Sequence, residues 1–423
     1  YPLNPSGAET IWNEHRESTR GPALDITGMS YAALDTQPLQ WPLREGDTTG
    51  KVRLYEDGVF PTADGRARFA ALAYQPVAEP RDARYPFSLT TGRLRDHWHG
   101  MSRTGTLGRL FGHVAEPALQ MNPQDMTRRL LTEGDLVHVT SRRGSVVVPV
   151  QAAPEVGLSQ AFMAMHWGPE YLSGCSSTGE RLGGVNALTT PAYCPISKQP
   201  ELKHAAIKVL KAELPWALLG VAWLPDDAAL VAREALKPLM ALFPFASCVP
   251  FGRERIGVLF RAASYEAPPD EVLTRIEALL GLAGADTLRY ADKKKGQHRA
   301  MRLVRDGATA RLEGFVLAGD TRAEAWIKTL LQDELPAQAY GRLLLSPGAK
   351  APVSVTDAAA TRGKQVCTCF NVNDIAIQDH LNQCAGSEHA RLASLQAALK
   401  CGTNCGSCVP ELKRMVRVIR HIA

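Results

Sequence analysis

The sequence lacks the features of a membrane protein. Its uncharged run from Pro238 to Gly252 is short and carries three prolines, whereas a membrane-spanning helix needs about 20 predominantly apolar residues. No signal-peptide pattern is visible at the N-terminal end. We therefore expect a soluble protein without membrane association.

Long runs of one charge are also missing. The chain has 48 Lys and Arg against 43 Asp and Glu, a formal net charge of +5, without the clustered basic segments of a nucleic-acid-binding arm. This excess argues at most for a local anionic ligand, and we expect no nucleic-acid partner. A glycine-rich dinucleotide fingerprint is absent. We also find no nucleophile or acid–base pair, so no catalytic residue is predicted.

Cysteines are concentrated near the end of the chain. Six of the nine lie between Cys367 and Cys408, and they include a C-x-C pair, Cys367 and Cys369, and a C-x-x-C pair, Cys405 and Cys408. Such spacing is typical of metal ligands in a reducing compartment rather than of disulfides, which predicts a cytoplasmic protein. Four thiolates can hold either zinc or an iron-sulfur cluster, and spacing alone does not choose between them.

The length of 423 residues suggests several domains. The chain starts at Tyr1, within a sequence typical of the middle of a protein. We therefore expect it to be a fragment of a longer protein. Shifts of pattern predict five parts, which are an irregular segment at 1–84, a mainly β domain at 85–213, an α/β module at 214–345, a linker at 346–364 rich in Ala, Pro, Ser and Thr, and three short helices around the thiols at 365–423.

Local patterns predict individual elements. Phe87 to Thr91 is expected to be a strand, and Leu136 to Thr140 with Ser145 to Val150 a hairpin around Arg142-Arg143-Gly144. Asp270 to Leu280 has the apolar spacing of a helix. Further expectations are an N-cap in Met121 to Asp125, a solvated turn at Lys293 to Lys295, a cap by Asp320 or Thr321 for a helix that runs to Leu331, a cap by Asp374, a helix marked by Leu392, Leu395 and Leu399, and a last helix that begins near Pro410.

The loop from Thr91 to Gly100 has the richest polar chemistry in the β domain. It combines cationic side chains, two histidines and Trp98, which suit a phosphate or a polar heterocycle. A solvated loop with one buried tryptophan is an equally good interpretation. His166-Trp167-Gly168 and the segments around Asn122, Asn186 and Lys203 are, taken singly, more typical of core, turn and cap residues.

The cysteine segment resembles the bacterioferritin-associated-ferredoxin-like 2Fe-2S domain, which occurs alone or attached to nitrite and nitrate reductases. The resemblance rests on Cys367-x-Cys369 and on Gly402 to Cys408. It implies Cys367, Cys369, Cys405 and Cys408 as the cluster ligands, with Cys384 and Cys401 as spares.

The segments Thr91 to Gly100, Asn122 to Asp125 and Pro195 to Lys203, with Asn186, resemble the molybdopterin-dinucleotide-binding domain of the dimethyl-sulfoxide-reductase superfamily. The assimilatory nitrate reductase branch is most similar, and Asn13-Glu14-His15 with Asp25 to Gly28 resembles the part before that domain. The resemblance implies a β-barrel and a Mo-bis(molybdopterin guanine dinucleotide) cofactor. Its contacts would be Thr91, Gly92, Arg93, His97, His99, Asn122, Asp125, Asn186 and Lys203.

The segment Gly314 to Thr321 is similar to the small C-terminal domain of flavin-dependent nitrite reductase, and we expect it to be a scaffold without flavin. The fold class expected from these resemblances is multidomain α+β. It would comprise a mainly β-barrel dinucleotide-binding domain, a small α/β reductase-like module and a small helical 2Fe-2S domain. The family's N-terminal half, with its 4Fe-4S cysteines and the protein ligand to molybdenum, is absent from these residues.

These resemblances imply an assimilatory nitrate reductase, inactive as this fragment alone, that reduces nitrate to nitrite by oxygen-atom transfer at molybdenum. A flavoprotein reductase, ferredoxin or flavodoxin would supply electrons through the 2Fe-2S cluster. Three alternatives stay open. They are a stand-alone electron-transfer or iron-delivery module, a structural zinc site, and another molybdenum oxidoreductase such as a formate dehydrogenase, against which only analogy argues.

Overall fold

The computed structural model describes residues 7–21, 23–356 and 363–419. The chain divides into two units, Tyr1–Gln75 and Pro76–Ala423, and each is treated by itself. Residues 357–362 of the predicted linker lie outside the described residues.

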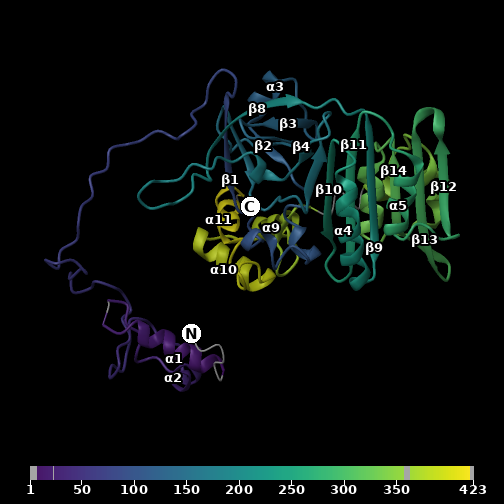
Figure 1. Ribbon diagram of the computed structural model, residues 1–423. Helices are drawn as coiled ribbons and strands as arrows, with labels where there is room; N and C mark the ends of the chain where they lie inside the picture. Colours follow the sequence, from purple (N-terminus) through teal and green to yellow (C-terminus); the bar gives the residue numbers. More distant parts are fainter. Residues whose placement is uncertain (1–6, 22, 357–362, 420–423) are drawn as a thin grey trace. The chain divides into compact units, whose positions relative to one another are not determined.

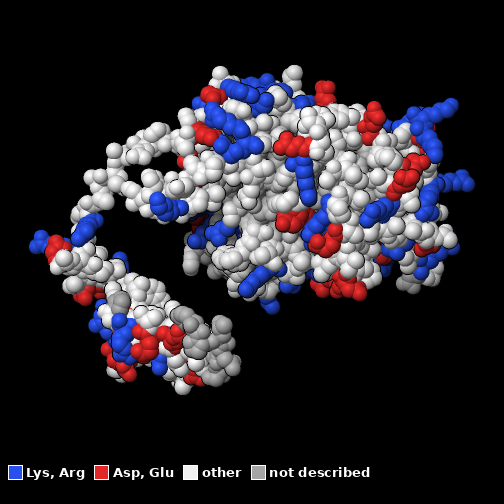
Figure 2. Space-filling model, in the orientation of Figure 1, with Lys and Arg blue, Asp and Glu red and all other residues white. Residues whose placement is uncertain are grey.

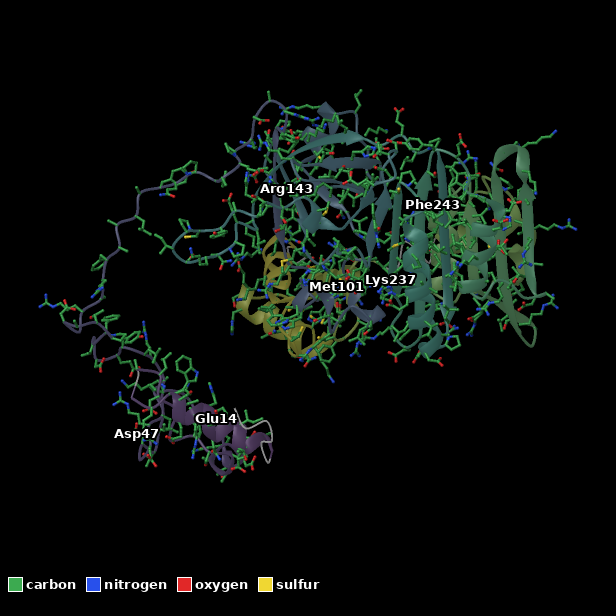
Figure 3. All side chains as sticks on the ribbon, in the orientation of Figure 1. Glu14, Asp47, Met101, Arg143, Lys237 and Phe243 are labelled. Atoms are coloured by element: carbon green, nitrogen blue, oxygen red, sulfur yellow. The ribbon has the colours of Figure 1, made fainter. Side chains whose placement is uncertain are left out.

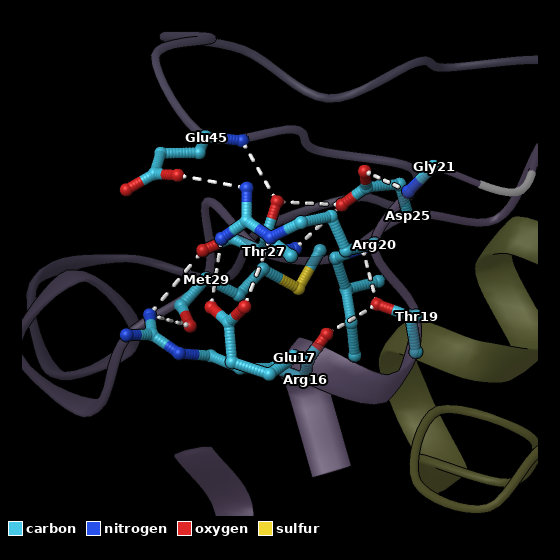
Figure 4. A network of polar contacts seen from close by, with 10 residues as sticks. Arg16, Glu17, Thr19, Arg20, Gly21, Asp25, Thr27, Met29 and Glu45 are labelled. Atoms are coloured by element: carbon cyan, nitrogen blue, oxygen red, sulfur yellow. Dashed lines mark hydrogen bonds and ion pairs between the residues drawn. The ribbon is translucent and has the colours of Figure 1, made fainter. Parts of the chain in front are cut away.

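The first unit is mostly irregular backbone with two helices, α1 (Ala8–Ser18) and α2 (Tyr31–Thr36). A polar network around Asp25 organises it (Figure 4). The Asp25 carboxylate accepts hydrogen bonds from the backbone N–H groups of Gly21 and Thr27, each at 2.9 Å, and from the Thr27 hydroxyl at 2.6 Å. These bonds hold the pKa of Asp25 at about 2. The Asp25-Ile26-Thr27-Gly28 segment is thus a turn built on a carboxylate.

The second unit begins with a closed barrel of six strands in the order β1-β5-β2-β4-β3-β8 (Figure 1). The predicted strand at Phe87 and the predicted hairpin are confirmed, with Arg143 at the hairpin turn (Figure 3). Asn122 caps α3 (Pro123–Arg128), as its sequence predicts. The barrel strands are β1 (Phe87–Gly92), β2 (Leu119–Met121), β3 (Leu136–Thr140), β4 (Ser145–Ala152), β5 (Gln160–Ala164) and β8 (Ala205–Lys211).

An antiparallel sheet of eight strands follows, in the order β12-β13-β14-β9-β11-β10-β6-β7. Its first two strands in the sequence come from the barrel segment, because β6 pairs with β10 through Ala246 opposite Ser173. The strands are β6 (Leu172–Cys175), β7 (Arg181–Leu182), β9 (Trp216–Leu224), β10 (Phe245–Phe251), β11 (Ile256–Ser264), β12 (Thr287–Asp292), β13 (Gln297–Asp306) and β14 (Thr309–Ala318).

Side chains of this sheet alternate between two cores, as the two-residue period of a strand requires. Leu218 and Ala222 of β9 pack with α4 (Asp226–Met240), α5 (Asp270–Leu279) and Phe243 (Figure 3). Leu219 and Val221 belong instead to a core shared with the barrel, α6 (Glu324–Gln332) and α7 (Gly341–Leu345). The sheet therefore joins the barrel to the helices on its other side.

The cap predicted for α6 is wrong. The helix begins at Glu324 with Ala323 at the N-cap and no side-chain cap. The Asp320 carboxylate accepts from the backbone N–H of Arg322 at 3.0 Å and from its guanidinium at 2.9 Å. Asp320 therefore closes a turn before the helix. Its carboxylate is bound to Arg322 and does not cap α6. The helix at Asp270 and the exposed turn at Lys293–Lys295 are confirmed.

The C-terminal region is a small helical domain below the barrel in Figure 1. Its helices α9 (Asp374–Asn382), α10 (Glu388–Leu399) and α11 (Val409–Val418) enclose a compact core that includes Ile377, Leu395 and Leu412. Two short strands, β15 (Gln365–Cys367) and β16 (Val372–Asn373), precede them. The described residues also contain the short 3-10 helices η1 (His99–Met101), η2 (Gly108–Phe111), η3 (Val185–Ala187), η4 (Lys293–Lys295) and η5 (Gln338–Tyr340).

The N-cap of α9 is Asn373, whose side chain accepts from Ala376 N at 2.8 Å. The predicted cap, Asp374, is the first helical residue. Its carboxylate instead accepts from Lys364 N at 2.7 Å. The observed structure is the expected mixed α+β type with a six-stranded barrel and a helical C-terminal region. On the face in view, positive and negative side chains are interspersed over this unit (Figure 2).

Candidate cofactor and cluster sites

Several of the residues predicted to contact a dinucleotide meet at one edge of the barrel. Strands β1 and β5 are parallel, with Gly92 opposite Ala164, so the loops that follow both strands leave the barrel together. The Thr91 hydroxyl donates to Leu202 O at 2.6 Å, and Lys203 Nζ donates to Thr91 O at 3.1 Å. These bonds fix the start of the polar loop against the segment at Lys203.

Two buried histidines face this edge. His97 follows β1 and His166 follows β5, and their ring centroids are 5.9 Å apart. His166 Nδ1 accepts from the backbone N–H of Leu94 at 3.1 Å, and His97 Nδ1 lies 3.1 Å from the Thr104 hydroxyl. Both Nε2 atoms are buried without a hydrogen-bond partner.

The two imidazoles are held neutral. Burial, and then the repulsion that a protonated His166 would exert, lower the pKa of His97 to about 4, while burial and the charge of Arg93 lower the pKa of His166. Because Nδ1 of neutral His166 accepts a hydrogen bond, its proton is on Nε2. An unpaired buried donor costs free energy unless a ligand or water satisfies it. This N–H therefore fits the acceptor atoms of a polar cofactor.

An exposed platform lies beside the histidines. The Arg93 guanidinium carbon is 5.5 Å from the centroid of the Trp98 ring, and the His99 ring stacks on Trp98 with centroids 5.0 Å apart. The backbone turns sharply here, with a φ of 46° at His99 and 59° at Gly100. A guanidinium next to stacked rings suits an anionic group attached to a heterocycle.

The other predicted contacts lie in two places. Asn186 is exposed on η3, whose Val185 N donates to Trp167 O at 3.0 Å, so it belongs to the same edge. Asn122 and Asp125 lie at the opposite end of β5. There Asn122 Nδ2 donates to Val156 O at 2.8 Å, and Ser159 N donates to Asp125 at 2.6 Å. Both side chains thus form hydrogen bonds with the segment that precedes β5. Their role in cofactor binding stays a prediction.

His166 was not predicted as a site residue. In the sequence it stands next to Trp167, which is buried in the core, and the pair is typical of packing residues. His166 lies beside His97 because β1 and β5 pair in parallel, which brings together residues that are far apart in the sequence.

The cysteine loops bring the predicted ligands together in two pairs. Cys369 Sγ lies 3.3 Å from Cys405 Sγ, and Cys367 and Cys408 lie together in the buried core of this domain. Cys405 is exposed, whereas Cys367 and Cys408 are buried. Among the described residues, no group of three or more His, Cys, Asp or Glu side chains is arranged around a single metal ion.

The thiols differ in acidity. Burial raises the pKa of Cys408 to about 12, and the charge of Cys367 adds to this. Burial also raises the pKa of the neighbouring Cys401 to about 11. For Cys405 burial acts in the same direction, but hydrogen bonds from Ser407 and Cys369 outweigh it and lower the pKa. Metal binding must therefore displace protons from the buried thiols.

The cysteine domain contacts the loop that follows β1. Arg95 donates to Val366 O at 2.6 Å and to Glu411 at 2.7 Å. Arg253, after β10, donates to the carbonyl groups of Thr368 at 2.7 Å and Cys369 at 2.9 Å. The two candidate sites thus share one loop.

A cavity of about 900 Å³ lies between the barrel, the sheet and α11. Its lining includes Pro149, Ala262, Glu116, Arg261 and Glu411. None of the predicted dinucleotide contacts lines it. Among the described helices, none combines the length and apolar character required to cross a membrane.

Two protein families match parts of this chain. Residues 87–206 match the Molydopterin dinucleotide binding domain, and residues 365–417 match the BFD-like [2Fe-2S] binding domain. The first range contains the polar loop, and the second contains both cysteine pairs. Both family resemblances inferred from the sequence are thereby confirmed, while the predicted domain boundaries stay predictions.

Three curated proteins are similar over longer stretches. A nitrate reductase of Klebsiella oxytoca is 30% identical over 412 residues, which cover 93% of this chain and 41% of that protein. A nitrate reductase of Synechocystis sp. is 38% identical over 47% of this chain and 28% of that protein. The F420-dependent formate dehydrogenase subunit alpha of Methanocaldococcus jannaschii is 31% identical over 49% of this chain and 28% of that protein. The chain thus spans less than half the length of these relatives.

Proposed function

We propose that this chain, which carries a molydopterin dinucleotide binding domain and a BFD-like [2Fe-2S] binding domain, is the C-terminal part of an assimilatory nitrate reductase. One observation carries the proposal. The similarity to the Klebsiella oxytoca nitrate reductase covers 93% of the chain, so it extends beyond the dinucleotide-binding domain to the sheet and the cysteine domain. The similarity to the formate dehydrogenase covers 49%.

The barrel edge would bind a Mo-bis(molybdopterin guanine dinucleotide) cofactor. The exposed Arg93 guanidinium and Trp98–His99 stack are available to a polar, anionic heterocycle, and the unpaired Nε2–H of His166 is buried at the same edge. Thr91, Gly92 and Lys203 would shape the loop around it. Molybdenum, when bound, supplies the oxygen-atom transfer that converts nitrate to nitrite.

His97 would complete this edge as a second neutral imidazole, with His99 and Asn186 at the exposed side. Asn122 and Asp125 would act indirectly by holding the segment before β5. Neutral imidazoles donate or accept hydrogen bonds without adding charge. The site would therefore recognise its ligand by hydrogen bonds and leave charge compensation to Arg93 and Lys203.

The four thiols of Cys367, Cys369, Cys405 and Cys408 would hold a 2Fe-2S cluster. Two pairs of thiolates match the two irons of such a cluster, and the pair of Cys369 and Cys405 is the one that contains an exposed thiol. This side would receive electrons from a flavoprotein reductase, ferredoxin or flavodoxin in the cytoplasm. A 4Fe-4S cluster would belong to a part of the enzyme outside this chain.

We assign the parts of the chain accordingly. Residues 1–84 would belong to the catalytic region, 85–213 to the dinucleotide-binding domain and 214–345 to a scaffold module. Residues 346–364 would link this module to the 2Fe-2S domain at 365–423. The sheet that pairs β6 with β10 supports a fixed position of the scaffold module against the barrel.

A formate dehydrogenase is the second candidate, favoured by the similarity to the Methanocaldococcus jannaschii protein over 49% of this chain. The test uses the full-length protein made in a host that builds the molybdenum cofactor. Iron, zinc and molybdenum are quantified, and reduction of nitrate by reduced viologen is compared with oxidation of formate. Iron with stoichiometric molybdenum and nitrate reduction is expected. Formate oxidation alone, or iron without molybdenum, would overturn the proposal, and zinc without iron would exclude the cluster.

A further inference from the structure

The carboxylate of Asp96 lies between the two cysteine loops. Thr368 Oγ1 donates to Asp96 Oδ2 at 2.7 Å, and Ser407 Oγ donates to Asp96 Oδ1 at 3.3 Å. Thr368 is the residue between Cys367 and Cys369, and Ser407 directly precedes Cys408. One side chain from the barrel thus connects the C-x-C loop with the C-x-x-C loop.

This contact is protected from water. The Asp96 side chain is 6% exposed and Thr368 is buried. Buried hydrogen bonds to a carboxylate have short, defined geometry and resist thermal displacement more than exposed ones. Asp96 also belongs to the loop after β1, three residues beyond Arg93 and directly before His97. The loop that faces the proposed dinucleotide site therefore also holds the cysteine loops.

We propose that Asp96 is a positioning residue for the iron-sulfur cluster, which holds the two cysteine loops in register and keeps the reduction potential of the cluster low. The inference rests on the proposed 2Fe-2S cluster, but it does not depend on nitrate as the substrate. Asp96 acts through Thr368 and Ser407 and ligates no metal.

The charges around the cysteine loops are balanced. Arg95 pairs with Asp96 at 3.2 Å and with Glu411 at 2.7 Å, and His113 lies 3.6 Å from Glu411. Arg253 is bound to the carbonyl groups of Thr368 and Cys369. Arg253 also pairs with Glu254 at 3.5 Å, and Arg414 pairs with Glu411 at 3.6 Å, so three guanidinium groups are matched by three carboxylates. Neutralising Asp96 would leave an excess of positive charge, which favours the reduced cluster because reduction adds an electron.

Ser407 gives a second reason for the same direction. Its hydroxyl oxygen lies 3.3 Å from Asp96 Oδ1 and 3.1 Å from Cys405 Sγ. The single hydroxyl proton can be donated to one acceptor at a time, so the Asp96 carboxylate and the Cys405 sulfur compete for it, and the carboxylate is the stronger acceptor. Without the carboxylate the proton is free for the sulfur, and hydrogen bonds to cluster sulfurs change the reduction potential. Loss of negative charge and gain of a sulfur hydrogen bond both stabilise the reduced form.

The decisive experiment compares Asp96→Asn, Asp96→Glu and wild-type full-length protein by EPR-monitored redox titration and iron analysis. For Asp96→Asn, we expect the cluster to be retained and its reduction equilibrium to shift about tenfold toward the reduced form, about 59 mV for one electron. Asp96→Glu keeps the charge and should stay near wild type. Asp82→Asn removes a carboxylate that pairs with Arg142 on the barrel, and it should leave the potential unchanged. A wild-type potential in Asp96→Asn would overturn the inference.

Thr368→Val covers the case in which Asp96→Asn contains no iron. This substitution removes one of the two bridging hydrogen bonds and preserves all charges. Reduced iron content or a broadened EPR signal in Thr368→Val would support the bridge, and wild-type behaviour would overturn it. Because none of these readouts uses nitrate, a protein with the expected potential shift but no nitrate reduction would refute the proposed function and leave this inference standing.

Discussion

Cys405 and Cys384 differ in their surroundings, although both belong to the C-terminal domain. Cys405 contacts Cys369, whereas the Cys384 thiol lies near its own neighbour, with Ala385 O at 3.9 Å. We expect Cys405→Ser to lose cluster iron and to lower donor-driven activity of the full-length enzyme by more than about tenfold. Loss of a residue that only hydrogen-bonds to a metal ligand already lowers activity by about tenfold or more, and loss of a ligand itself should have a larger effect.

The matched control is Cys384→Ser, which should keep its iron and its EPR signal. Reduced viologen, if it reaches the other centres directly, should still drive turnover in Cys405→Ser. Iron analysis, EPR and the two activity assays measure this prediction together. Unchanged donor-driven activity in Cys405→Ser would remove the relay role of the cluster.

The acidity of His97 predicts how stability depends on pH. Its folded pKa of about 4 is below that of a free histidine because the ring is buried. Between about pH 6.5 and pH 4 the unfolded chain binds a proton that the folded chain does not, so acidification favours unfolding. The effect of this side chain is about 2 kcal/mol, because water that reaches the loop screens part of the full shift.

Denaturant unfolding of the cofactor-free protein at pH 7.5 and pH 4.5 measures this dependence. His97→Gln should lose less stability between the two pH values than wild type does. The control His389→Gln, at an exposed position, should lose as much stability as wild type. Equal losses in wild type and His97→Gln would show that the buried ring does not carry the effect.

Sequence reasoning reached the residues whose chemistry is local. The cysteine pairs are predicted by spacing, and Arg93 to Trp98 form one continuous loop between β1 and η1. His166 was missed because its place beside His97 results from a parallel strand pair, and Asp96 because its partners Thr368 and Ser407 lie in another domain. Such contacts arise from long-range pairing, which no local pattern contains.

Gly92 ends β1 where the polar loop begins, and its place depends on a close approach. A Cβ at this position would lie 2.7 Å from the Cε2 atom of Phe162 on β5. Gly92→Ala should therefore destabilise the protein by about 1–3 kcal/mol through overpacking. Phe162→Leu in the same chain should restore part of this loss, because the smaller side chain vacates the space.

Gly341→Ala is the control for this pair, since a Cβ there meets no atom within 4 Å and the residue starts α7. It should be neutral or slightly stabilising. Denaturation midpoints of wild type, Gly92→Ala, Phe162→Leu and the double variant measure the coupling between residues 92 and 162. Additive effects of Gly92→Ala and Phe162→Leu would contradict a direct contact.

Helices and strands with a strong apolar period were predictable, but caps were less so. The helix at Asp270 follows from its spacing, as does the strand at Phe87. Asp320 and Asp374 failed as caps because nearby backbone N–H groups, of Arg322 and Lys364, bind their carboxylates. A carboxylate near a helix start has several possible donors, and only the folded loop selects one.

The sequence predicted separate modules along the chain, and within the second unit the structure joins two of them in one sheet. The first unit ends at Gln75. In the second unit the dinucleotide-binding segment contributes β6 and β7 to the same sheet as residues 216–318. Ser173 pairs with Ala246 although the two residues are far apart in the sequence. The change of sequence pattern near residue 214 therefore separates two stretches of chain that both contribute strands to this sheet.

Strand β6 also covers an edge that would otherwise be open. All seven residues of β10 are buried, and β6 pairs with its outer side at Ala246 and Ser247. A fragment that starts at residue 214 would expose the N–H and C=O groups of an apolar strand, which is a template for aggregation. We expect such a fragment to form large particles in light scattering, whereas one that starts at residue 76 stays monodisperse. The barrel segment thus shields part of this sheet edge from strand pairing with other molecules.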